Sequence, residues 1–326
     1  MTENKKFKVL IASTTFEGID KAYEVLTTDD FELIKKSKKD REKWEKDDLI
    51  KAIQGKDGII IGGEYELDEE IIVAANKLKV ISLNCNGFNN IDVEAARRRK
   101  IAVTNTPGIN NNEVANYIMG QILSIVRHIV RANQVIREGK WVTDDINSSI
   151  GLKDSTLGLI GLGSIGQQVA QRANCFGMKV ISNVRHPSPK RAKKYDVKFV
   201  SKNEIYQKAD VVALCCPLTD DTRDLIGEHE LKMMKRDAYL INSMRGPIVD
   251  EKALYKALNN NWIAGAALDV FGEEPLVDSK LFKLDNVILT PHIAGLVESS
   301  IQAAAVLAAE NLKKILLTGD SENQVN

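Results

Sequence analysis

The sequence predicts an α/β protein with two doubly wound parallel-sheet domains. Its length of 326 residues suits about two domains at roughly 150 residues each. Short β-branched runs alternate with helix-period segments, which is typical of parallel strands joined by crossover helices. This alternation stops after residue 105 and resumes at residue 156, so the chain divides in two. The cleft between two such domains is the expected binding site.

The strands expected in the first domain are almost entirely apolar, as is usual when helices cover both faces of a sheet. They are predicted at residues 8–13, 58–62, 79–85 and 101–105, with helices near 19–26, 46–53, 68–75 and 93–99. Residues 35–51 carry many charges of both signs, which indicates a solvated surface helix and loop. The basic run 97–100 complements the negative end of a helix dipole.

A long apolar-periodic stretch at residues 112–135 predicts one helix that joins or bridges the domains. The second domain is then expected to contain strands at 156–160, 179–184, 210–215, 238–241, 264–268 and 287–289, with helices near 165–176, 202–208 and 252–258. This is a doubly wound unit of roughly Rossmann length. A last, Ala-rich helix at about 299–317 should pack back on the first domain. We therefore predict a first domain of residues 1–107 plus 296–326 and a second of 108–295.

The composition excludes several classes of protein. Lys and Arg total 45 and Asp and Glu total 45, so no net charge is available to gather nucleic acid or an anionic membrane. No run of 18 apolar residues is present, and the N-terminus lacks the features of a secretory signal, so a cytoplasmic location is expected. The four cysteines, Cys85, Cys175, Cys215 and Cys216, lack metal-ligand spacing and are expected to be buried free thiols.

A glycine-rich motif lies between a predicted strand and a predicted helix. Gly161 permits a tight turn, Gly163 lets backbone amides approach a pyrophosphate, and Gly166 lets the helix pack close to the strand. The N–H groups at the start of that helix would then hold the phosphate charge. The strand–motif–helix context favours a dinucleotide site over a purely structural glycine turn.

The next strand ends without the carboxylate that usually accepts the ribose hydroxyls of NAD. Val184 stands at that position and Arg185 follows it. A missing carboxylate removes repulsion against a 2′-phosphate, and a guanidinium can bind one with two hydrogen bonds. His186, Ser188 and Lys190 could add donors. NADP is therefore the expected cofactor, and the alternative is a relaxed NAD site with Arg185 in solvent.

His292 is the leading acid–base candidate among the four histidines. It follows the carboxyl end of a strand, where open α/β sheets bind their ligands. His128 is expected within a helix, in a packing or surface role. His229 stands between two glutamates and should be exposed, and His186 belongs to the cofactor strand.

Two further strand ends bring charge to the same edge of the sheet. Arg245 follows one strand, and Glu274 lies in the segment after the next. Spacing alone leaves open whether each takes part in catalysis or in a loop salt bridge.

Four motifs occur in order along the second domain, and together they resemble the D-isomer-specific 2-hydroxyacid dehydrogenase family. They are GLGSIG at 161–166, INSMRGPIVDE at 241–251, ALDVFGEEP at 267–275 and LTPHIAG at 289–295. Residues 89–92 and 105–108 resemble first-domain signatures, so the likeness covers nearly the whole chain. It is strongest toward phosphoglycerate-dehydrogenase-like and glyoxylate/hydroxypyruvate-reductase-like members. The resemblance implies a flavodoxin-like substrate domain, a Rossmann cofactor domain and an NAD(P)-dependent enzyme.

The resemblance also implies roles for individual residues. Arg245 matches the arginine that binds the substrate carboxylate and polarises its carbonyl, and His292 matches the proton donor in reduction. Glu274 matches the acid that hydrogen-bonds this imidazole. Asn86 and Gly87 match the loop whose N–H groups hold the substrate carboxylate.

Asp269 matches the residue that orients the nicotinamide carboxamide, Ser243 lies on a cofactor-contacting turn, and Pro217 and Thr222 flank the adenosine half. The expected cofactor-binding set is Gly161, Leu162, Gly163, Ser164, Ile165, Gly166, Val184, Arg185, His186, Pro217, Thr222, Ser243, Asp269 and Gly295. No metal site is expected.

The chain departs from the family pattern in its first domain. Asn89 stands where an Asp is frequent, and Asn86 where a smaller or apolar residue is common. Residues 62–65 lack the arginine that phosphoglycerate-type members often place nearby and carry Glu64 instead. Because like charges repel, a phosphorylated substrate is disfavoured against hydroxypyruvate or glyoxylate.

We therefore expect an oxidoreductase that transfers a hydride between NAD(P)H and a small 2-oxo acid, giving a D-2-hydroxy acid. The segment 112–135 resembles the family's inter-subunit element, so a homodimer is expected. The alternative is a dinucleotide-sensing binding protein like the co-repressors that share the fold. A dehydrogenase acting on formate or phosphite is a third interpretation, which no residue supports.

Overall fold

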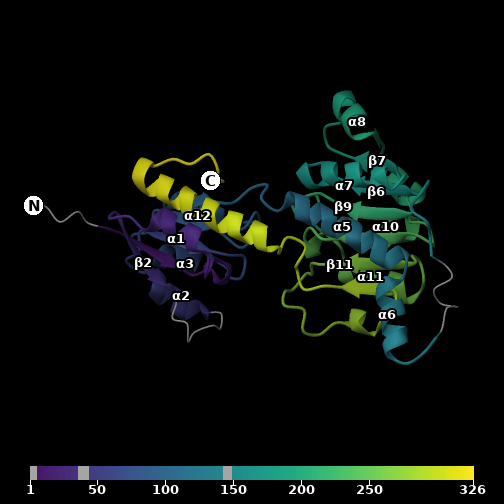
Figure 1. The fold of residues 1–326 in the computed structure, drawn as a ribbon, viewed down its shortest axis with the longest axis horizontal. Coiled ribbons are helices and arrows are strands. Elements are labelled where there is room, and N and C mark those ends of the chain that lie inside the picture. The colour runs from purple at the N-terminus through teal and green to yellow at the C-terminus, as the bar shows by residue number, and fades with distance from the viewer. Residues whose placement is uncertain (1–5, 36–43, 142–148) are drawn as a thin grey trace, which may run out of the picture. The chain divides into compact units, whose positions relative to one another are not determined.

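The computed structural model describes residues 6–35, 44–141 and 149–326, and the chain divides into two compact units (Figure 1). Unit 1 comprises Met1–Asn110 and Leu296–Asn326, and unit 2 comprises Asn111–Gly295. Each unit is built on one sheet whose strand pairs are all parallel. The prediction of two parallel-sheet α/β domains is confirmed.

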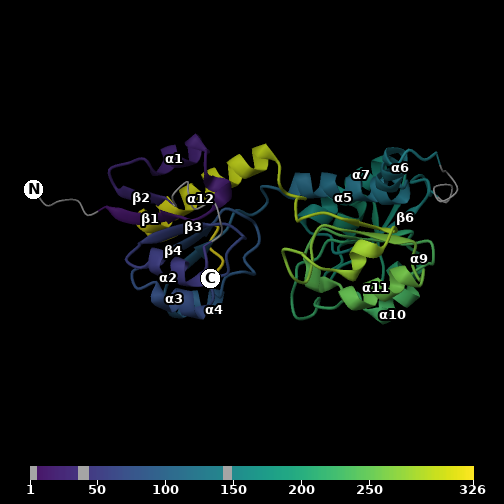
Figure 2. The same cartoon turned by 90° about the horizontal axis from the view of Figure 1, so that it is seen from below.

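The sheet of unit 1 has the strand order β2-β1-β3-β4-β5. Its strands are β1 (Phe7–Ile11), β2 (Phe31–Lys35), β3 (Gly58–Ile61), β4 (Val80–Leu83) and β5 (Ala102–Thr104). Its shorter helices are α1 (Asp20–Leu26), α2 (Lys46–Ile53), α3 (Glu69–Ala74) and α4 (Val93–Arg98). The last helix, α12 (Glu298–Thr318), packs on α1, β3 and β4, so the chain returns to its first domain as predicted (Figure 2).

Strand β2 is absent from the sequence prediction. It lies at the edge of the sheet and mixes polar with apolar residues, so it lacks the continuous apolar run of the other strands. The predicted helix at 46–53 is confirmed. The remainder of the charged segment 35–51 lies mostly outside the described residues.

The sheet of unit 2 has the order β12-β11-β10-β9-β6-β7-β8, so the chain reverses direction across the sheet between β6 and β9. Its strands are β6 (Thr156–Ile160), β7 (Lys179–Asn183), β8 (Val197–Phe199), β9 (Val211–Leu214), β10 (Tyr239–Asn242), β11 (Gly265–Leu268) and β12 (Val287–Leu289). Its helices include α7 (Ser164–Cys175), α8 (Pro189–Tyr195), α9 (Lys202–Lys208), α10 (Glu228–Met233) and α11 (Glu251–Asn259). Open sheets of this kind bind ligands at such a reversal, beyond the carboxyl ends of the strands.

The core of unit 2 lies on both faces of this sheet. Val211 and Ala213 of β9 join one buried cluster, and Val212 and Leu214 join the other. Burial of both faces explains why the strands read as continuous apolar runs.

The single helix predicted at 112–135 is wrong. The segment forms two helices, α5 (Asn111–Val126) and α6 (Ile129–Arg137), which are separated at His128. His128 has φ +51°, a left-handed conformation that ends a helix, so it does not lie within one. The apolar period continues across the break, and hydrophobic periodicity therefore does not reveal it.

The expectation of four buried thiols is also wrong in part. Cys215 and Cys216 are buried, Cys85 is half-buried and Cys175 is exposed. Burial raises the pKa of the Cys216 thiol to about 11 and raises that of Cys215 further, so both remain protonated at neutral pH. Within residues 6–35, 44–141 and 149–326, no cluster of potential metal ligands is present and no helix is long and apolar enough to cross a membrane.

Candidate active site

Two positions of the glycine-rich turn between β6 and α7 require glycine. Gly161 has φ +102°, and a Cβ built there would lie 2.5 Å from the carbonyl oxygen of Cys215. A Cβ at Gly166 would lie 2.7 Å from the carbonyl oxygen of Gly161. The first glycine therefore brings the turn against β9, and the last lets α7 pack on the turn itself.

Gly163 differs from both of these glycines because open space surrounds the place where its Cβ would be. It is the N-cap of α7, a helix of 12 residues whose first N–H groups point out of the helix end. A turn with free space at a helix N-terminus fits the pyrophosphate of a dinucleotide.

Two side chains stabilise the glycine-rich turn by hydrogen bonds to its backbone. Gln167 donates to the carbonyl oxygen of Leu162 at 3.1 Å, and the Arg191 guanidinium donates to the same oxygen. The Tyr195 hydroxyl in turn donates to Gln167 at 2.6 Å. Sequence reasoning missed Arg191, because α8 is too short to give a periodic signal.

Arg185 lies two residues after the end of β7, and its guanidinium forms an ion pair with Asp221 at 2.7 Å. Val184, the residue at the position of the missing carboxylate, comes directly after β7. Ser188 caps α8 by accepting from the backbone N–H of Arg191. Asp221 was also missed, because it is 36 residues from Arg185 in sequence.

The loop after β9 carries Pro217 and Thr222 and is held by its own hydroxyls. Thr222 Oγ1 donates to the carbonyl oxygen of Pro217 and accepts from the backbone N–H of Thr219, both at 2.7 Å. Because β9 neighbours β6, this loop and the glycine-rich turn leave the sheet from adjacent strand ends.

Arg245 lies on a turn after β10 that Asn242 stabilises. The Asn242 amide donates to the carbonyl oxygen of Arg245 at 2.9 Å and accepts from the N–H of Met244 at 3.1 Å. Ser243 is buried and donates to Gln121 of α5 at 2.6 Å. The Arg245 guanidinium donates to the carbonyl oxygen of Met244 at 2.6 Å. Asn242 is a supporting residue that the sequence did not single out.

Gly246 allows the backbone of the Arg245 turn to pack closely against the loop that carries Glu274. A Cβ at Gly246 would lie 1.9 Å from the carbonyl carbon and oxygen of Phe271, so the two backbones are in direct contact. Glu251 also accepts from the N–H of Gly272. The two loops are therefore fixed against each other by contacts that admit no side chain at residue 246.

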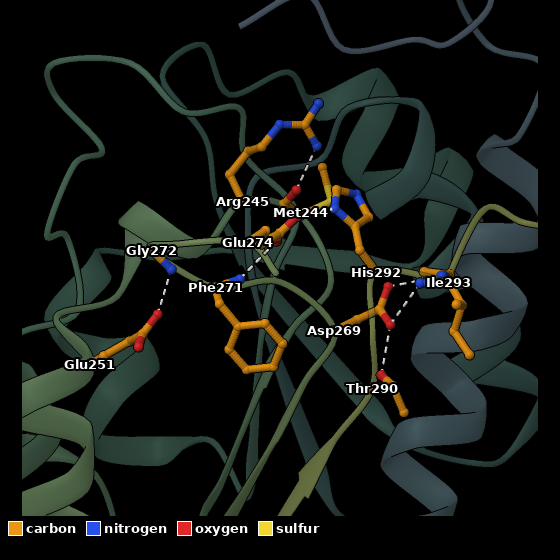
Figure 3. A network of polar contacts seen from close by, with 11 residues as sticks. Met244, Arg245, Glu251, Asp269, Phe271, Gly272, Glu274, Thr290, His292 and Ile293 are labelled. Atoms are coloured by element: carbon orange, nitrogen blue, oxygen red, sulfur yellow. Dashed lines mark hydrogen bonds and ion pairs between the residues drawn. The ribbon is translucent and has the colours of Figure 1, made fainter. Parts of the chain in front are cut away.

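Glu274 and His292 form a hydrogen-bonded pair, with 2.7 Å between Glu274 Oε2 and His292 Nδ1 (Figure 3). The other carboxylate oxygen, Oε1, accepts from the N–H of Phe271 at 2.9 Å. Both side chains remain partly open, with 34% of Glu274 and 49% of His292 exposed. The carboxylate therefore fixes one ring nitrogen and leaves Nε2 of His292 available to a substrate.

The pKa of Glu274 lies below its usual range. Burial raises this pKa, but the hydrogen bonds from His292 and from the Phe271 N–H, with the charges of His292 and Arg245, together outweigh that effect. Figure 3 shows Arg245, Glu274 and His292 gathered at one end of the polar network. Glu274 is thus an ionised partner for an imidazolium.

Asp269 holds the backbone turn that carries His292. Its side chain is fully buried and accepts from Thr290 Oγ1 at 2.6 Å, from the N–H of Ile293 at 3.0 Å and from the N–H of Ala294 at 2.8 Å. His292 has φ +54°, a strained conformation for a side chain of its size. A buried carboxylate with three donors can stabilise such a turn.

The predicted substrate loop of unit 1 is held by groups of unit 1. Asn105 donates to the carbonyl oxygen of Asn86 at 2.7 Å, and Cys85 donates to that of Gly87 at 3.2 Å. Glu64, after β3, accepts from the N–H of Thr14 at 2.9 Å. Asn86, Gly87 and Glu64 thus all lie at the carboxyl edge of this sheet.

Of the predicted residues, Arg245, Glu274 and His292 come together within unit 2. The glycine-rich turn, Arg185, Pro217 and Thr222 lie at the carboxyl edge of the same sheet, whereas Asn86 and Gly87 belong to unit 1. A glycine turn at a helix N-terminus, with an acid-paired histidine and an arginine on one sheet edge, defines an NAD(P)-dependent oxidoreductase.

Comparison with known proteins agrees with this class. Residues 119–294 match the family "D-isomer specific 2-hydroxyacid dehydrogenase, NAD binding domain". A glyoxylate reductase of Thermococcus litoralis is 40% identical over 81% of this chain and 82% of its own length. A D-3-phosphoglycerate dehydrogenase of Methanocaldococcus jannaschii is 40% identical over 86% of this chain but only 54% of its own length. The chain belongs to the D-isomer-specific 2-hydroxyacid dehydrogenase family.

Solved structures share the two-unit fold. A protein of Thermus thermophilus is 35% identical with a TM-score of 0.88, covering 98% of this chain and 100% of its own. An acyclic imino acid reductase solved in complex with NADPH and D-Arg is 27% identical with a TM-score of 0.85, again covering 98% and 100%.

Proposed function

We propose that this enzyme reduces a small, unphosphorylated 2-oxo acid of the glyoxylate or hydroxypyruvate kind and prefers NADPH as its cofactor. The observation that carries the proposal is the Glu274–His292 pair beside Arg245, in the same unit as a glycine turn that fits a dinucleotide.

His292, Glu274 and Arg245 have different roles in the proposed reaction. The nicotinamide ring, when bound, supplies the hydride that is added to the carbonyl carbon of the substrate. His292, charged by a proton and held at Nδ1 by Glu274, gives the proton on Nε2 to the carbonyl oxygen and becomes neutral. Arg245 pairs with the substrate carboxylate and stabilises the charge that develops on the oxygen. In the reverse direction, neutral His292 takes the hydroxyl proton.

The remaining residues bind and orient. We propose that Gly161, Gly163 and Gly166, with the first N–H groups of α7, hold the pyrophosphate. Asp269 and Ser243 are assigned to the nicotinamide half, and Pro217 and Thr222 to the adenosine half. Asn86 and Gly87 are assigned to the substrate carboxylate, so unit 1 would supply substrate contacts and unit 2 the cofactor site.

Two features support a small, unphosphorylated substrate. Glu64 brings negative charge to the carboxyl edge of the unit 1 sheet, which opposes a phosphate. The relative named glyoxylate reductase also matches this chain over most of its own length, whereas the relative named phosphoglycerate dehydrogenase is nearly twice as long as the matched part.

The NADPH preference rests on Arg185 and on the missing acid at Val184. The imino acid reductase that was solved with NADPH supports it from a relative of the same fold. The alternative, an NAD site in which Arg185 makes no cofactor contact, predicts equal or better use of NADH.

We further propose a homodimer and a cytoplasmic location. Helix α6 and the residues after it expose four large apolar side chains, Ile129, Val130, Ile136 and Trp141, at 50% to 88%, and exposed apolar side chains of this kind suit contact with a second copy. A monomer in equilibrium sedimentation would contradict the dimer.

A substrate panel tests the proposed function. Initial rates would be measured for glyoxylate, hydroxypyruvate, 3-phosphohydroxypyruvate, pyruvate and a bulky 2-oxo acid, each with NADPH and with NADH. We expect the highest kcat/KM for glyoxylate or hydroxypyruvate with NADPH. Turnover confined to the phosphorylated substrate, or a clear NADH preference, contradicts the corresponding half of the proposal. Tight cofactor binding without turnover would instead support a dinucleotide-sensing protein.

A further inference from the structure

The loops after β7 and β9 meet on the two sides of β6. In the sheet order β9-β6-β7, β6 carries the glycine-rich turn and lies between the other two strands. Arg185 follows β7 and Asp221 follows β9, yet their side chains are 2.7 Å apart. The ion pair therefore links the strand ends that flank the proposed cofactor turn.

Asp221 takes no part in building its own loop. The turn at 217–223 is held by the hydroxyl of Thr222 and by a backbone bond from Arg223 to Thr219. Within the described parts of the chain, the Asp221 carboxylate is bonded only to Arg185. Both side chains are open to solvent, at 71% for Arg185 and 76% for Asp221. Removal of the Asp221 charge should therefore leave the loop intact.

Arg185 is paired with an acid, whereas two other polar side chains near the end of β7 have backbone partners. Arg191 instead donates to the carbonyl oxygen of Leu162, and Ser188 is occupied as the cap of α8. No carboxylate stands at Val184 after β7, but Asp221, in the loop after β9, brings one to the next residue, Arg185. The positive charge that the sequence offers to a 2′-phosphate is thus already partly neutralised.

We propose that Asp221 is a specificity-determining residue that competes with the 2′-phosphate of NADP(H) for Arg185. This inference rests on the NADP(H) preference proposed above. A 2′-phosphate carries a charge of roughly −1.5 to −2 and must share or displace the guanidinium while it faces the like charge of Asp221. A 2′-hydroxyl makes no such demand and leaves the ion pair in place. Asp221 therefore weakens NADP(H) binding selectively and keeps NAD(H) acceptable to the site.

The test measures binding of 2′,5′-ADP and 5′-AMP to the full chain by calorimetry, so that no turnover is needed. The two probes differ only in the phosphate that the proposal concerns. The variants are D221N, its neighbour control D220N, R185Q and the double variant R185Q/D221N. Asp220 is also exposed and makes no contact that the proposal uses.

We expect D221N to tighten 2′,5′-ADP binding about twofold to fivefold, because exposed ion pairs have small interaction energies. Binding of 5′-AMP should not change, and D220N should leave both affinities near wild type. The gain from D221N should shrink at high ionic strength. In the R185Q background D221N should give no gain, because the group for which it competes is gone.

The outcomes separate this inference from the proposed function. If R185Q leaves 2′,5′-ADP affinity unchanged, the assigned basis of NADP(H) preference and the inference both fail. If R185Q weakens 2′,5′-ADP binding tenfold or more but D221N gives no gain, only the role of Asp221 is overturned. An equal gain for 5′-AMP and 2′,5′-ADP also overturns it, because competition must be specific to the 2′-phosphate.

Discussion

The carboxyl edges of the two sheets carry different chemistry on the same architecture. In unit 2 this edge presents a glycine turn, an arginine and an acid-paired histidine, which are groups that hold phosphate and move a proton. In unit 1 the corresponding edge presents amides, hydroxyls and the acid Glu64. This difference supports our proposal that unit 2 performs the reaction and that unit 1 selects the substrate. Substitutions in unit 2 should therefore lower turnover of every substrate, and those in unit 1 should change the ranking of substrates.

Arg245→Ala should leave the fold intact and give a large loss of activity, about 10²-fold to 10³-fold in kcat/KM for every 2-oxo acid. The variant removes both the partner of the substrate carboxylate and a charge beside the developing oxyanion. Arg245→Lys keeps the charge but loses the planar pair of donors, so it should recover only part of the activity. A loss confined to one substrate would contradict the division between the units.

Gly246→Ala and Gly163→Ala should separate folding from cofactor binding. A Cβ at residue 246 would lie 1.9 Å from backbone atoms of Phe271, whereas a Cβ at residue 163 meets nothing within 4 Å. We expect G246A to lower Tm by several degrees, because overpacking a fixed contact costs about 1–3 kcal/mol.

G163A should keep the wild-type Tm without cofactor but bind NADPH about tenfold more weakly, because its methyl group fills the space left for the pyrophosphate. Thermal melts and cofactor titrations distinguish the two variants. Equal cofactor affinity in G163A and wild type would contradict the assignment of the turn.

Glu274→Gln should lower kcat/KM by roughly tenfold to hundredfold. General acid–base catalysis contributes a factor of about 10²–10⁴ to the rate. Only part of this factor should be lost, because the glutamine amide oxygen can still accept a hydrogen bond from His292. It should also change how stability depends on pH. The pKa of Glu274 is lowered by folding, so its carboxylate stabilises the chain fully above the ordinary Glu pKa of about 4.3. This stabilisation is lost as the pH falls through the lower, folded pKa.

The Tm difference between wild type and E274Q, measured from pH 3 to pH 7, checks the sign. It should be constant at neutral pH and shrink at the acid end. A difference that grows as the pH falls would contradict the lowered pKa.

Glu64→Gln should have the smallest effect and should act on selectivity alone. Glutamine can still accept from the N–H of Thr14, so only the charge is removed. We expect kcat/KM for 3-phosphohydroxypyruvate to rise a few-fold relative to hydroxypyruvate, with little change for hydroxypyruvate itself. Glu66→Gln, an exposed neighbour, is the matched control. An equal loss for both substrates would place Glu64 in a general structural role.

The sequence predicted the parts of the molecule that local patterns determine. Strands buried on both faces read as apolar runs, and residues after parallel strands share one edge, which is why Arg245, Glu274 and His292 could be grouped before the fold was known. Short or edge elements such as β2 and β8 were missed, because they are neither long nor continuously apolar. The break at His128 has no glycine or proline to mark it.

The supporting contacts of the site could not be predicted. Asn242, Arg191 and Asp221 act through bonds that only the folded chain creates, and an asparagine, arginine or aspartate in a loop has many possible partners. Cys175 was expected to be buried, but it is the last residue of α7 and is exposed. The sequence thus located the candidate catalytic residues, and the structure was needed to find the contacts that hold them in place.

The most direct test of the central claim compares His292→Asn with wild type in a single-turnover experiment. Asparagine tolerates the left-handed backbone of residue 292 better than most residues, so the turn should persist. NADPH binding and the rate of NADPH oxidation would be measured in the same sample after addition of glyoxylate or hydroxypyruvate. We predict unchanged NADPH affinity and a rate lowered by about 10²-fold to 10⁴-fold. A variant that binds NADPH and oxidises it at nearly the wild-type rate would contradict the account.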